Sequence, residues 1–487
     1  MNWTVIWPLL IFLALIFFIG IYASRHVQRA PSFVQEYFLG SRELGGFLLA
    51  MTMAATYGSA SSFLSGPGAA YNYGLAWVLL SMSQVATGYF VLMILGKKFA
   101  IMAREYKAVT LVDFLFARYK SQTVVVLAAV SIVIFLFASM TAQWIGGARL
   151  IESITGLSYT LALIIFAVSV LVYVVIGGFR AVAITDMAQG LIMVGGTVTL
   201  FLAALKAGGG MENIMTTLYD ENPNLLSPYG SDLSLTSVYV SSFWILVGIG
   251  VIGLPQVAIR AMSYKNAKAM HRALVIGTIV VGVIMLGMHL IGVMARAIVP
   301  GITVGDKVMP ELAMTVMPDW LAGIVLAAPM AAIMSTVDSL LLIVSSAIIK
   351  DLYLHFSKKP AEEERLKKMS LAVTAVIGVV VFIVALQPPN LIIWLNLFSF
   401  GGLEAVFIWP IVFGLYWRRA NGRGAVASMV AGMVSYILFH SFYPTPFGLH
   451  TVVLPIIISF FMFVAVTLAT SRSSFFNKHL WTKTNKK

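Results

Sequence analysis

The chain has 487 residues, of which 60% are hydrophobic and only 10% charged, and its mean hydropathy is +0.93. A soluble protein of this length needs a far more polar surface, so the composition excludes a soluble globular protein and indicates one that lipid surrounds. The formal net charge is +13 and there is no cysteine, which excludes disulfides, Cys-based metal sites and thiol catalysis.

Apolar segments of about 20 residues follow one another along the whole chain. That length crosses the hydrocarbon of a bilayer as an α-helix, so the sequence predicts an all-α integral membrane protein. The longest connection expected on the outer side is 207–236. About thirteen spans are expected, over residues 4–22, 44–70, 75–96, 122–147, 158–177, 183–206, 237–259, 273–297, 320–347, 369–387, 391–416, 424–443 and 449–470.

The distribution of basic residues predicts the orientation. No basic stretch precedes the first segment, and Arg25, His26 and Arg29 follow it, which favours an uncleaved span with its N-terminus outside. Alternating sides from there places 28 of the 32 Lys and Arg, and the basic C-terminal tail, in the cytoplasm. We therefore expect a multi-pass membrane protein whose charge reflects topology rather than nucleic-acid binding. Four basic residues remain outside: Arg149, Lys206, Arg296 and Lys307.

Two spans carry the residues that interrupt a helix. The second contains Gly58 and the run 66–68, Gly-Pro-Gly, and the seventh contains three glycines and Pro255. Pro67 and Pro255 are 188 residues apart, about five spans, so a second repeat would enter the membrane from the opposite side. Small residues that only allow close helix packing are the alternative explanation. The paired arrangement favours a LeuT-like core of two inverted five-helix repeats with broken helices 2 and 7.

This interpretation divides the chain into five parts. A first helix and cytoplasmic loop occupy 1–36, and helices 2–6 form the first repeat over 37–206. An external loop, 207–236, leads to the second repeat, helices 7–11, over 237–423. Helices 12 and 13 and the basic tail complete the chain over 424–487.

Three acids lie deep inside apolar segments: Asp186, Asp338 and Glu404. An ionised side chain is costly in hydrocarbon and is retained where it meets water, a cation or a polar partner. Asp186 has an alternative role as a partner of Arg180. Glu404 could be a ligand group or a helix-packing partner. Buried acids combined with broken helices predict a cation-coupled transporter.

Hydroxyl groups surround one of these acids in the ninth span. Ser335, Thr336 and Ser339 lie within five residues of one another, and 335, 338 and 339 share a helical face. Serine in membrane helices often bonds only the carbonyl of the preceding turn. Three hydroxyls beside a carboxylate instead favour a sodium site, completed by carbonyls that an unwound helix leaves free.

Several stretches resemble the sodium/solute symporter family across residues 41–417. They are GSRELGG (40–46), SGPGAAYNYG (65–74), IGGARL (145–150), GGFRAVAITDMAQG (177–190), MSTVDSLLLIVSSA (334–347) and KDLY (350–353). The resemblance implies the same 5+5 core, a place in the bacterial inner membrane and a co-transported sodium ion between the second and ninth spans. The ligands that it implies are the carbonyls of Ala55, Gly58 and Ala332 and the hydroxyls of Ser335 and Thr336.

The resemblance also bears on a second cation. It implies that Asp186 lines the cytoplasmic exit path and, in some members, helps to hold a second sodium. Tyr57 stands where the proline-transporting branch carries Asp, and Asp338 stands where members with two sodium ions use a hydroxyl. Two nearby carboxylates, with Ser339 beside them, would bind a cation strongly or share a proton. The number of coupled sodium ions stays open at this point.

Within the family the chain resembles the pantothenate-transporting branch, in runs that include 55–80, 250–265, 392–410 and 414–421. Pantothenate is a small, flexible anion with two hydroxyls and an amide, so its pocket needs several hydrogen-bonding groups. A half-helix N-terminus can supply the positive electrostatic feature; Arg149 is an alternative, although Glu152 offers it a structural partner. The substrate candidates are Tyr57, Ser59, Ser61, Ser62, Gln84, Gln143, Trp144, Arg149, Trp244, Gln256, Trp394, Asn396, Ser399 and Glu404.

Sodium-driven uptake of a carboxylated vitamin precursor is therefore the leading functional hypothesis. Uptake of another small organic acid or an amino acid is the alternative within transport. An ATP-driven pump lacks support because no P-loop is present, and a membrane enzyme lacks a cluster of His, Asp or Cys at a membrane face. A transporter-like sensor would add a cytoplasmic signalling domain. His289 is isolated in a span and is interpreted as a packing residue.

Overall fold

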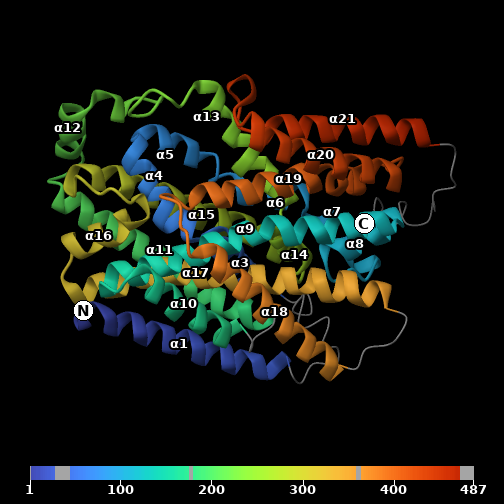
Figure 1. Cartoon of the computed structure of the whole chain (residues 1–487), viewed down its shortest axis with the longest axis horizontal. Coiled ribbons are helices and arrows are strands. Elements are labelled where there is room, and N and C mark those ends of the chain that lie inside the picture. The colour runs from blue at the N-terminus through green and yellow to red at the C-terminus, as the bar shows by residue number, and fades with distance from the viewer. Residues whose placement is uncertain (1, 28–43, 175–178, 358–362, 472–487) are drawn as a thin grey trace.

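The computed structural model describes residues 2–27, 44–174, 179–357 and 363–471. These residues form helices and connections, with one isolated parallel bridge between Leu44 and Tyr264. The long helices run side by side along the longest axis of the molecule (Figure 1). Together with their apolar composition, this arrangement confirms an all-helical membrane protein.

Ten helical segments among the described residues are long and apolar enough to cross a membrane. Each of them coincides with one of the spans expected from the sequence. A shorter apolar helix, α10 (Tyr159–Val174), lies where the fifth span was expected. The ten are α1 (Trp3–Val27), α5 (Leu75–Met82) with α6 (Thr87–Ile94), α9 (Gln122–Thr155), α11 (Phe179–Ala207), α15 (Ala267–Ile298), α17 (Asp319–Ser346) with the π-helix η7 (Ala347–Leu354), α18 (Glu363–Ala385), α19 (Ile393–Tyr416), α20 (Gly422–Phe442) and α21 (Val453–Thr470).

The first broken helix is formed by α3 (Gly46–Tyr57), the π-helix η2 (Ser61–Ser65) and α4 (Gly66–Tyr73), which bend by 68°. The break falls at Gly58, whose backbone is extended, and Pro67 lies in the first turn of α4, where a proline is tolerated. Beyond the break, a Cβ at Gly68 would lie 2.3 Å from the carbonyl oxygen of Gly305. The glycine is therefore needed for close packing, and the chain unwinds earlier, at Gly58.

The second broken helix consists of α13 (Ser237–Phe243), the π-helix η4 (Trp244–Ile249), the 3₁₀ turn η5 (Gly250–Gly253) and α14 (Pro255–Met262). Its bend is 52°. Leu254 is extended because the ring of Pro255 disfavours a helical conformation in the preceding residue. Both interruptions expected from the sequence are thus present.

Short helices mark the two ends of the bundle. At one end lie α12 (Met211–Glu221), α16 (Val308–Val316) and the start of α1, and at the other lie α7 (Gly96–Glu105), α8 (Leu111–Tyr119) and the end of α21 (Figure 1). The connection 207–236, expected to be a loop, therefore contains helix α12 and the 3₁₀ turn η3 (Pro223–Leu226).

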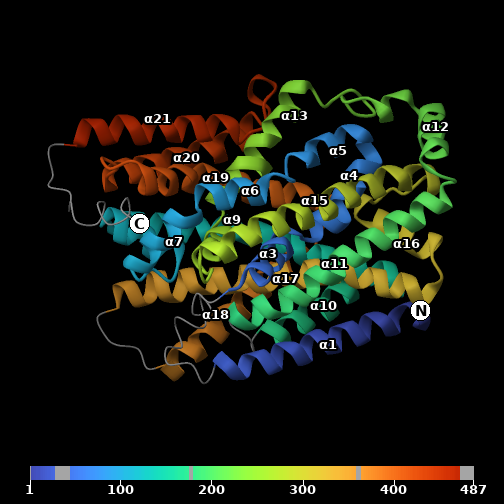
Figure 2. The same cartoon turned by 180° about the vertical axis from the view of Figure 1, so that it is seen from behind.

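The centre of the bundle is formed by α17. In the apolar stretch of α17 and η7, 94% of the residues are buried, whereas in that of α18 the share is 24%. Helix α17 packs against α11, α1, α9 and α3. Seen from behind, α3 lies beside α15 and α17 (Figure 2). The break in α3 therefore faces the most enclosed of the ten long helical segments that the structure describes.

Candidate functional site

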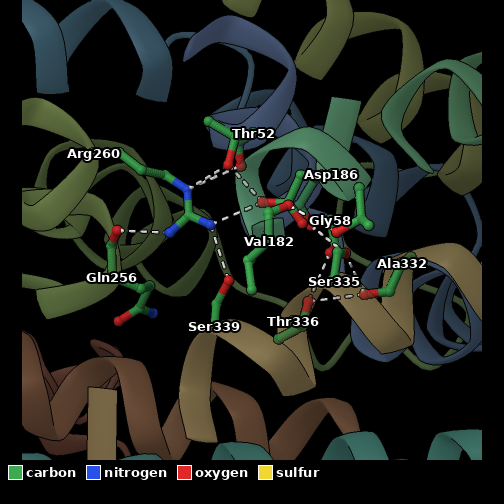
Figure 3. A network of polar contacts seen from close by, with 12 residues as sticks. Thr52, Gly58, Val182, Asp186, Gln256, Arg260, Ala332, Ser335, Thr336 and Ser339 are labelled. Carbon is green, nitrogen blue, oxygen red and sulfur yellow. Dashed lines mark hydrogen bonds and ion pairs between the residues drawn. The ribbon is translucent and has the colours of Figure 1, made fainter. Parts of the chain in front are cut away.

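Five oxygen atoms converge where α3 breaks beside α17 (Figure 3). The Ser335 hydroxyl donates to the carbonyl of Ala55 at 2.9 Å and to that of Ala332 at 3.1 Å. The Thr336 hydroxyl donates to the carbonyls of Gly58 and Ala332, both at 2.9 Å. All five residues are buried, so the groups expected as sodium ligands are brought together.

The break explains why the carbonyls of Ala55 and Gly58 are available. In an unbroken helix, each would accept a hydrogen bond from the N–H group four residues later. The chain turns away after Tyr57, and the oxygens of Ala55 and Gly58 are turned toward α17 instead. Neutral carbonyl and hydroxyl oxygens suit a small hard cation. For such a cation to bind, the hydroxyl hydrogens of Ser335 and Thr336 must rotate away from the cluster.

An ion pair lies beside this cluster, between Arg260 of α14 and Asp186 of α11. The guanidinium Nη2 is 3.0 Å from the carboxylate Oδ2, and both side chains are fully enclosed. Thr52 of α3 donates its hydroxyl to the same carboxylate oxygen at 2.5 Å and accepts a hydrogen bond from Arg260 Nε at 3.1 Å. Asp186 thus has a charged partner, while the side chain of Arg180, its alternative partner from the sequence, lies outside the described residues.

Arg260 also reaches the ninth span. Its Nη2 donates to the hydroxyl of Ser339 at 2.9 Å, one turn beyond Thr336 (Figure 3). Asp338 is buried next to Ser339 on the same helix. In this conformation, the guanidinium of Arg260 supplies the positive charge between Asp186 and Ser339. The sequence carries no signal for Arg260, because this residue stands at the end of an apolar segment, where topology alone accounts for a basic residue.

A small cavity lies on the other side of the break. Its volume is about 40 Å³, well below the several hundred Å³ of a typical ligand pocket. Five of the substrate candidates line it: Tyr57, Ser61, Ser62, Gln84 and Asn396. It is also lined by residues that were not candidates, among them Trp77, Ser81, Phe243 and His289.

The aromatic part of this wall is contiguous. The Trp77 ring centroid lies 6.0 Å from that of Phe243 and 5.9 Å from that of Trp394, with both contacts edge-on. Trp394 therefore packs against the wall residue Trp77 without lining the cavity itself. The sequence carried no signal for Trp77 or Phe243, because an aromatic residue in a membrane helix is far more often in the packed interior or at the lipid interface.

His289 of α15 combines a packing contact with a position in the cavity wall. Its Nδ1 lies 2.5 Å from the carbonyl oxygen of Met285. A carbonyl only accepts, so Nδ1 carries the proton, and in the neutral ring Nε2 is a hydrogen-bond acceptor. The expected packing role is confirmed by the bond to Met285, and the cavity position adds a second role that the sequence did not suggest.

The other substrate candidates lie elsewhere. Gln143 accepts from the Ala60 N–H at 2.8 Å and so supports the break, while Trp144 is buried against Phe166. Arg149 pairs with Glu152 at 3.0 Å, as the structural alternative predicted. Trp244 is 47% exposed on the outer surface of the helix bundle, and Gln256 lies beside Arg260 (Figure 3). Ser59 and Ser399 are buried and do not line the cavity.

Glu404 lies against the second broken helix. A Cβ at Gly250 would be 2.4 Å from its Oε2, so only glycine fits there. Neither carboxyl oxygen has a hydrogen-bond partner among the described residues. Glu404 therefore packs on η5, outside the lining of the cavity.

Two broken helices crossing a helix bundle, with carbonyls and hydroxyls that converge at one break, are typical of a secondary transporter of the LeuT-like class. The chain belongs to the sodium:solute symporter family, whose model matches residues 37–432. The sodium/pantothenate symporter of Escherichia coli strain K12 is 50% identical over 95% of this chain and 96% of its own length. That of Haemophilus influenzae is 47% identical over 93% and 94%. The osmoregulated proline transporter of Bacillus subtilis is 29% identical over 83% of each chain.

Solved structures agree on the fold. A Na⁺-coupled sialic acid symporter, in a substrate-bound outward-open state, matches with a TM-score of 0.79 at 21% identity over 96% of this chain and 97% of its own. A transporter of the nucleobase-cation-symport-1 family matches with a TM-score of 0.57 at 14% identity, over 89% and 93%. The protein is thus a multi-pass inner-membrane protein of a sodium-coupled transporter family.

Proposed function

We propose that this protein couples inward movement of sodium to the uptake of pantothenate. The observation that carries the proposal is the cluster of five oxygens at the α3 break, which adjoins a small cavity lined by both polar and aromatic side chains. The relatives named for sodium and pantothenate symport match 95% and 93% of this chain. We propose that the protein moves its substrate across the membrane without changing it chemically.

Sodium is placed between α3 and α17 in this proposal. The carbonyls of Ala55, Gly58 and Ala332 and the hydroxyls of Ser335 and Thr336 supply five neutral ligands. Binding would hold the break of α3 against α17. Because the break also forms the wall of the cavity, occupation of the ion site shapes the substrate site.

The cavity supplies partners for the groups of pantothenate. The hydroxyl of Ser61 is buried without a partner among the described residues, at the N-terminal end of the half-helix η2–α4. That end carries a positive dipole, which can neutralise the substrate carboxylate without a basic side chain. Gln84 and Asn396 offer amide groups to the hydroxyls and the amide of pantothenate, although Asn396 already accepts from Ser139 at 2.6 Å.

The proposed topology follows from the helices. Counting each bent pair as one span gives twelve, and α10 would be the thirteenth. Helices α3–α11 would form the first repeat and α13–α19 the second, in inverted orientation. The end that carries α7 and α8 would be cytoplasmic, and the start of α1 and α12 would be outside (Figure 1).

The substrate assignment is tested by competition in proteoliposomes. Sodium-driven uptake of labelled pantothenate should be inhibited by unlabelled pantothenate. Its neutral alcohol analogue, which lacks the carboxylate, should compete at least about tenfold less well, because one charge-assisted contact is lost. If the protein takes up a different organic acid in a saturable, sodium-driven manner and takes up no pantothenate, the substrate assignment is wrong and the symport mechanism still holds.

A further inference from the structure

A basic pocket lies at the end of the bundle where α8 meets α9 and α19 meets α20. This basic pocket has a volume of about 1180 Å³, far larger than that of the cavity beside the α3 break. Five of its lining residues are basic and none is acidic. Its basic residues are Arg118, Lys120, Arg418, Arg419 and Arg423.

One of these arginines sets the shape of the pocket. Arg118 is 7% exposed, and its guanidinium donates to the carbonyls of Gly414, Trp417 and Ala420 at 2.8, 3.0 and 3.1 Å. These carbonyls end α19 and form the turn into α20. The turn is thereby fixed, while the side chains of Arg418 and Arg419 on it are exposed.

Two helix N-termini add to the positive potential. Helix α9 begins after its N-cap Ser121, and α20 begins after its N-cap Asn421. A Cβ at Gly422 would lie 2.9 Å from the carbonyl oxygen of Tyr119 and 3.2 Å from Ser121 Cβ, so the two helix starts adjoin. Each N-terminus carries a partial positive charge that favours an anion. Residues 472–487, which follow the pocket residue Ser471, contain no Asp or Glu side chain to neutralise it.

We propose that the basic pocket binds the phosphate headgroup of an anionic phospholipid. The pocket lies at the ends of membrane helices, and its lining continues to Val426 and Ala427, one turn further along α20. A lipid phosphate held by the arginines can thus place its acyl chains along α20. Exposed arginine is suited to phosphate because its planar guanidinium donates two parallel hydrogen bonds. Clustered basic residues beside membrane helices are a general means of recognising anionic lipids.

The test uses the full-length protein in phosphatidylcholine nanodiscs, titrated with phosphatidylglycerol or cardiolipin while thermal unfolding is followed. We expect a saturable rise of the unfolding midpoint. The double variant Arg419→Gln/Arg423→Gln should need about 10- to 30-fold more anionic lipid for half of that rise. Arg419→Lys/Arg423→Lys keeps the charge but loses the paired hydrogen bonds, so it should recover part of the affinity, and that recovery separates loss of charge from misfolding.

A matched control removes the same charge from the same end of the protein. Lys268 and Arg272 are exposed at the start of α15, next to the loop that Arg104 of α7 contacts. Lys268→Gln/Arg272→Gln should leave the lipid titration unchanged. Equal losses in both double variants would show a diffuse surface attraction and overturn the site. Reproduction of the full midpoint rise by inorganic phosphate alone would overturn the lipid assignment.

Discussion

Arg260 and Asp186 form an ion pair of 3.0 Å in which neither side chain is accessible to solvent. The pair joins α14, the end of the second broken helix, to α11. Through Thr52 it also includes α3, the start of the first broken helix, and through Ser339 it includes α17. One guanidinium therefore connects both broken helices to the two helices beside the proposed ion site (Figure 3).

This connection suggests how an ion site can control access. Ser339 lies one turn from Thr336 along α17, so the proposed sodium ligand and the partner of Arg260 move together. The pair therefore ties α14 to α11 beside the proposed ion site.

Removing one partner of the pair should destabilise the protein strongly. Arg260→Gln leaves the Asp186 carboxylate buried without a counter-charge, which costs on the order of 3–5 kcal/mol. The double variant Asp186→Asn/Arg260→Gln should recover much of that loss, since no isolated charge remains. Thermal unfolding in nanodiscs measures both. Additive destabilisation in the double variant would show that the pair is not coupled.

The two hydroxyls of the proposed sodium site should affect the response to sodium. Ser335→Ala and Thr336→Ala should each raise the sodium concentration for half-maximal uptake about 5- to 30-fold, because about 1–2 kcal/mol of ligand energy is lost. Ser345→Ala is a matched control on the same helix, since its hydroxyl bonds Ser370 away from the site. An unchanged sodium dependence in the Ser335→Ala/Thr336→Ala variant would show that sodium binds elsewhere.

Asp338 tests whether a second cation is transported. If Asp186, Asp338 and Ser339 take part in holding one, Asp338→Asn should reduce the charge moved per pantothenate while the first site still drives uptake. The ion would then have to share this region with the guanidinium of Arg260. Current and labelled uptake are measured together in proteoliposomes. An identical charge-to-substrate ratio, at normal rates, would exclude the two-cation account.

His289 should affect substrate affinity more than sodium affinity. Its Nε2 accepts in the neutral ring and can receive a hydroxyl or amide hydrogen of pantothenate. His289→Leu should raise KM for pantothenate about 5- to 10-fold through the loss of one hydrogen bond. His289→Gln, which keeps an acceptor, should recover part of the affinity, and the exposed His271→Leu should change neither constant. Equal rises of both constants in His289→Leu would indicate a general packing defect instead.

Asp306 should make stability depend on pH. This carboxyl is buried in the connection between α15 and α16, where it accepts from the Ser65 hydroxyl and from the Ile392 N–H at 3.3 Å. Burial raises its pKa from the ordinary 3.8 to about 7. A raised pKa in the folded state favours the protonated form, so its stabilising contribution is complete below pH 3.8 and lost as pH rises to about 7.

We expect the wild-type unfolding free energy to decline between pH 4 and 7 by a component on the order of 2–4 kcal/mol from this group. Asp306→Asn, which stays neutral, should lack that component. Thermal unfolding of both proteins across this pH range provides the comparison. Parallel pH profiles would show that Asp306 does not titrate in this range.

The sequence predicted the spans and the two breaks well, because hydrophobic length and Gly/Pro interruption depend on local chemistry. The grouping of the proposed sodium ligands could also be anticipated, since Ser335 and Thr336 stand in one short run and Gly58 marks the break of α3. Arg260, Trp77 and His289 could not be placed in this way. Their roles depend on which helices lie together, and an arginine at a span end, a buried tryptophan and a lone histidine each have a common structural explanation.

The central claim is tested most directly by uptake of labelled pantothenate into proteoliposomes with and without an inward sodium gradient. The account predicts accumulation that requires sodium and increases when the interior is made negative, because sodium carries charge inward. Equal uptake in potassium or choline buffers, with no pH gradient to replace sodium, would contradict it.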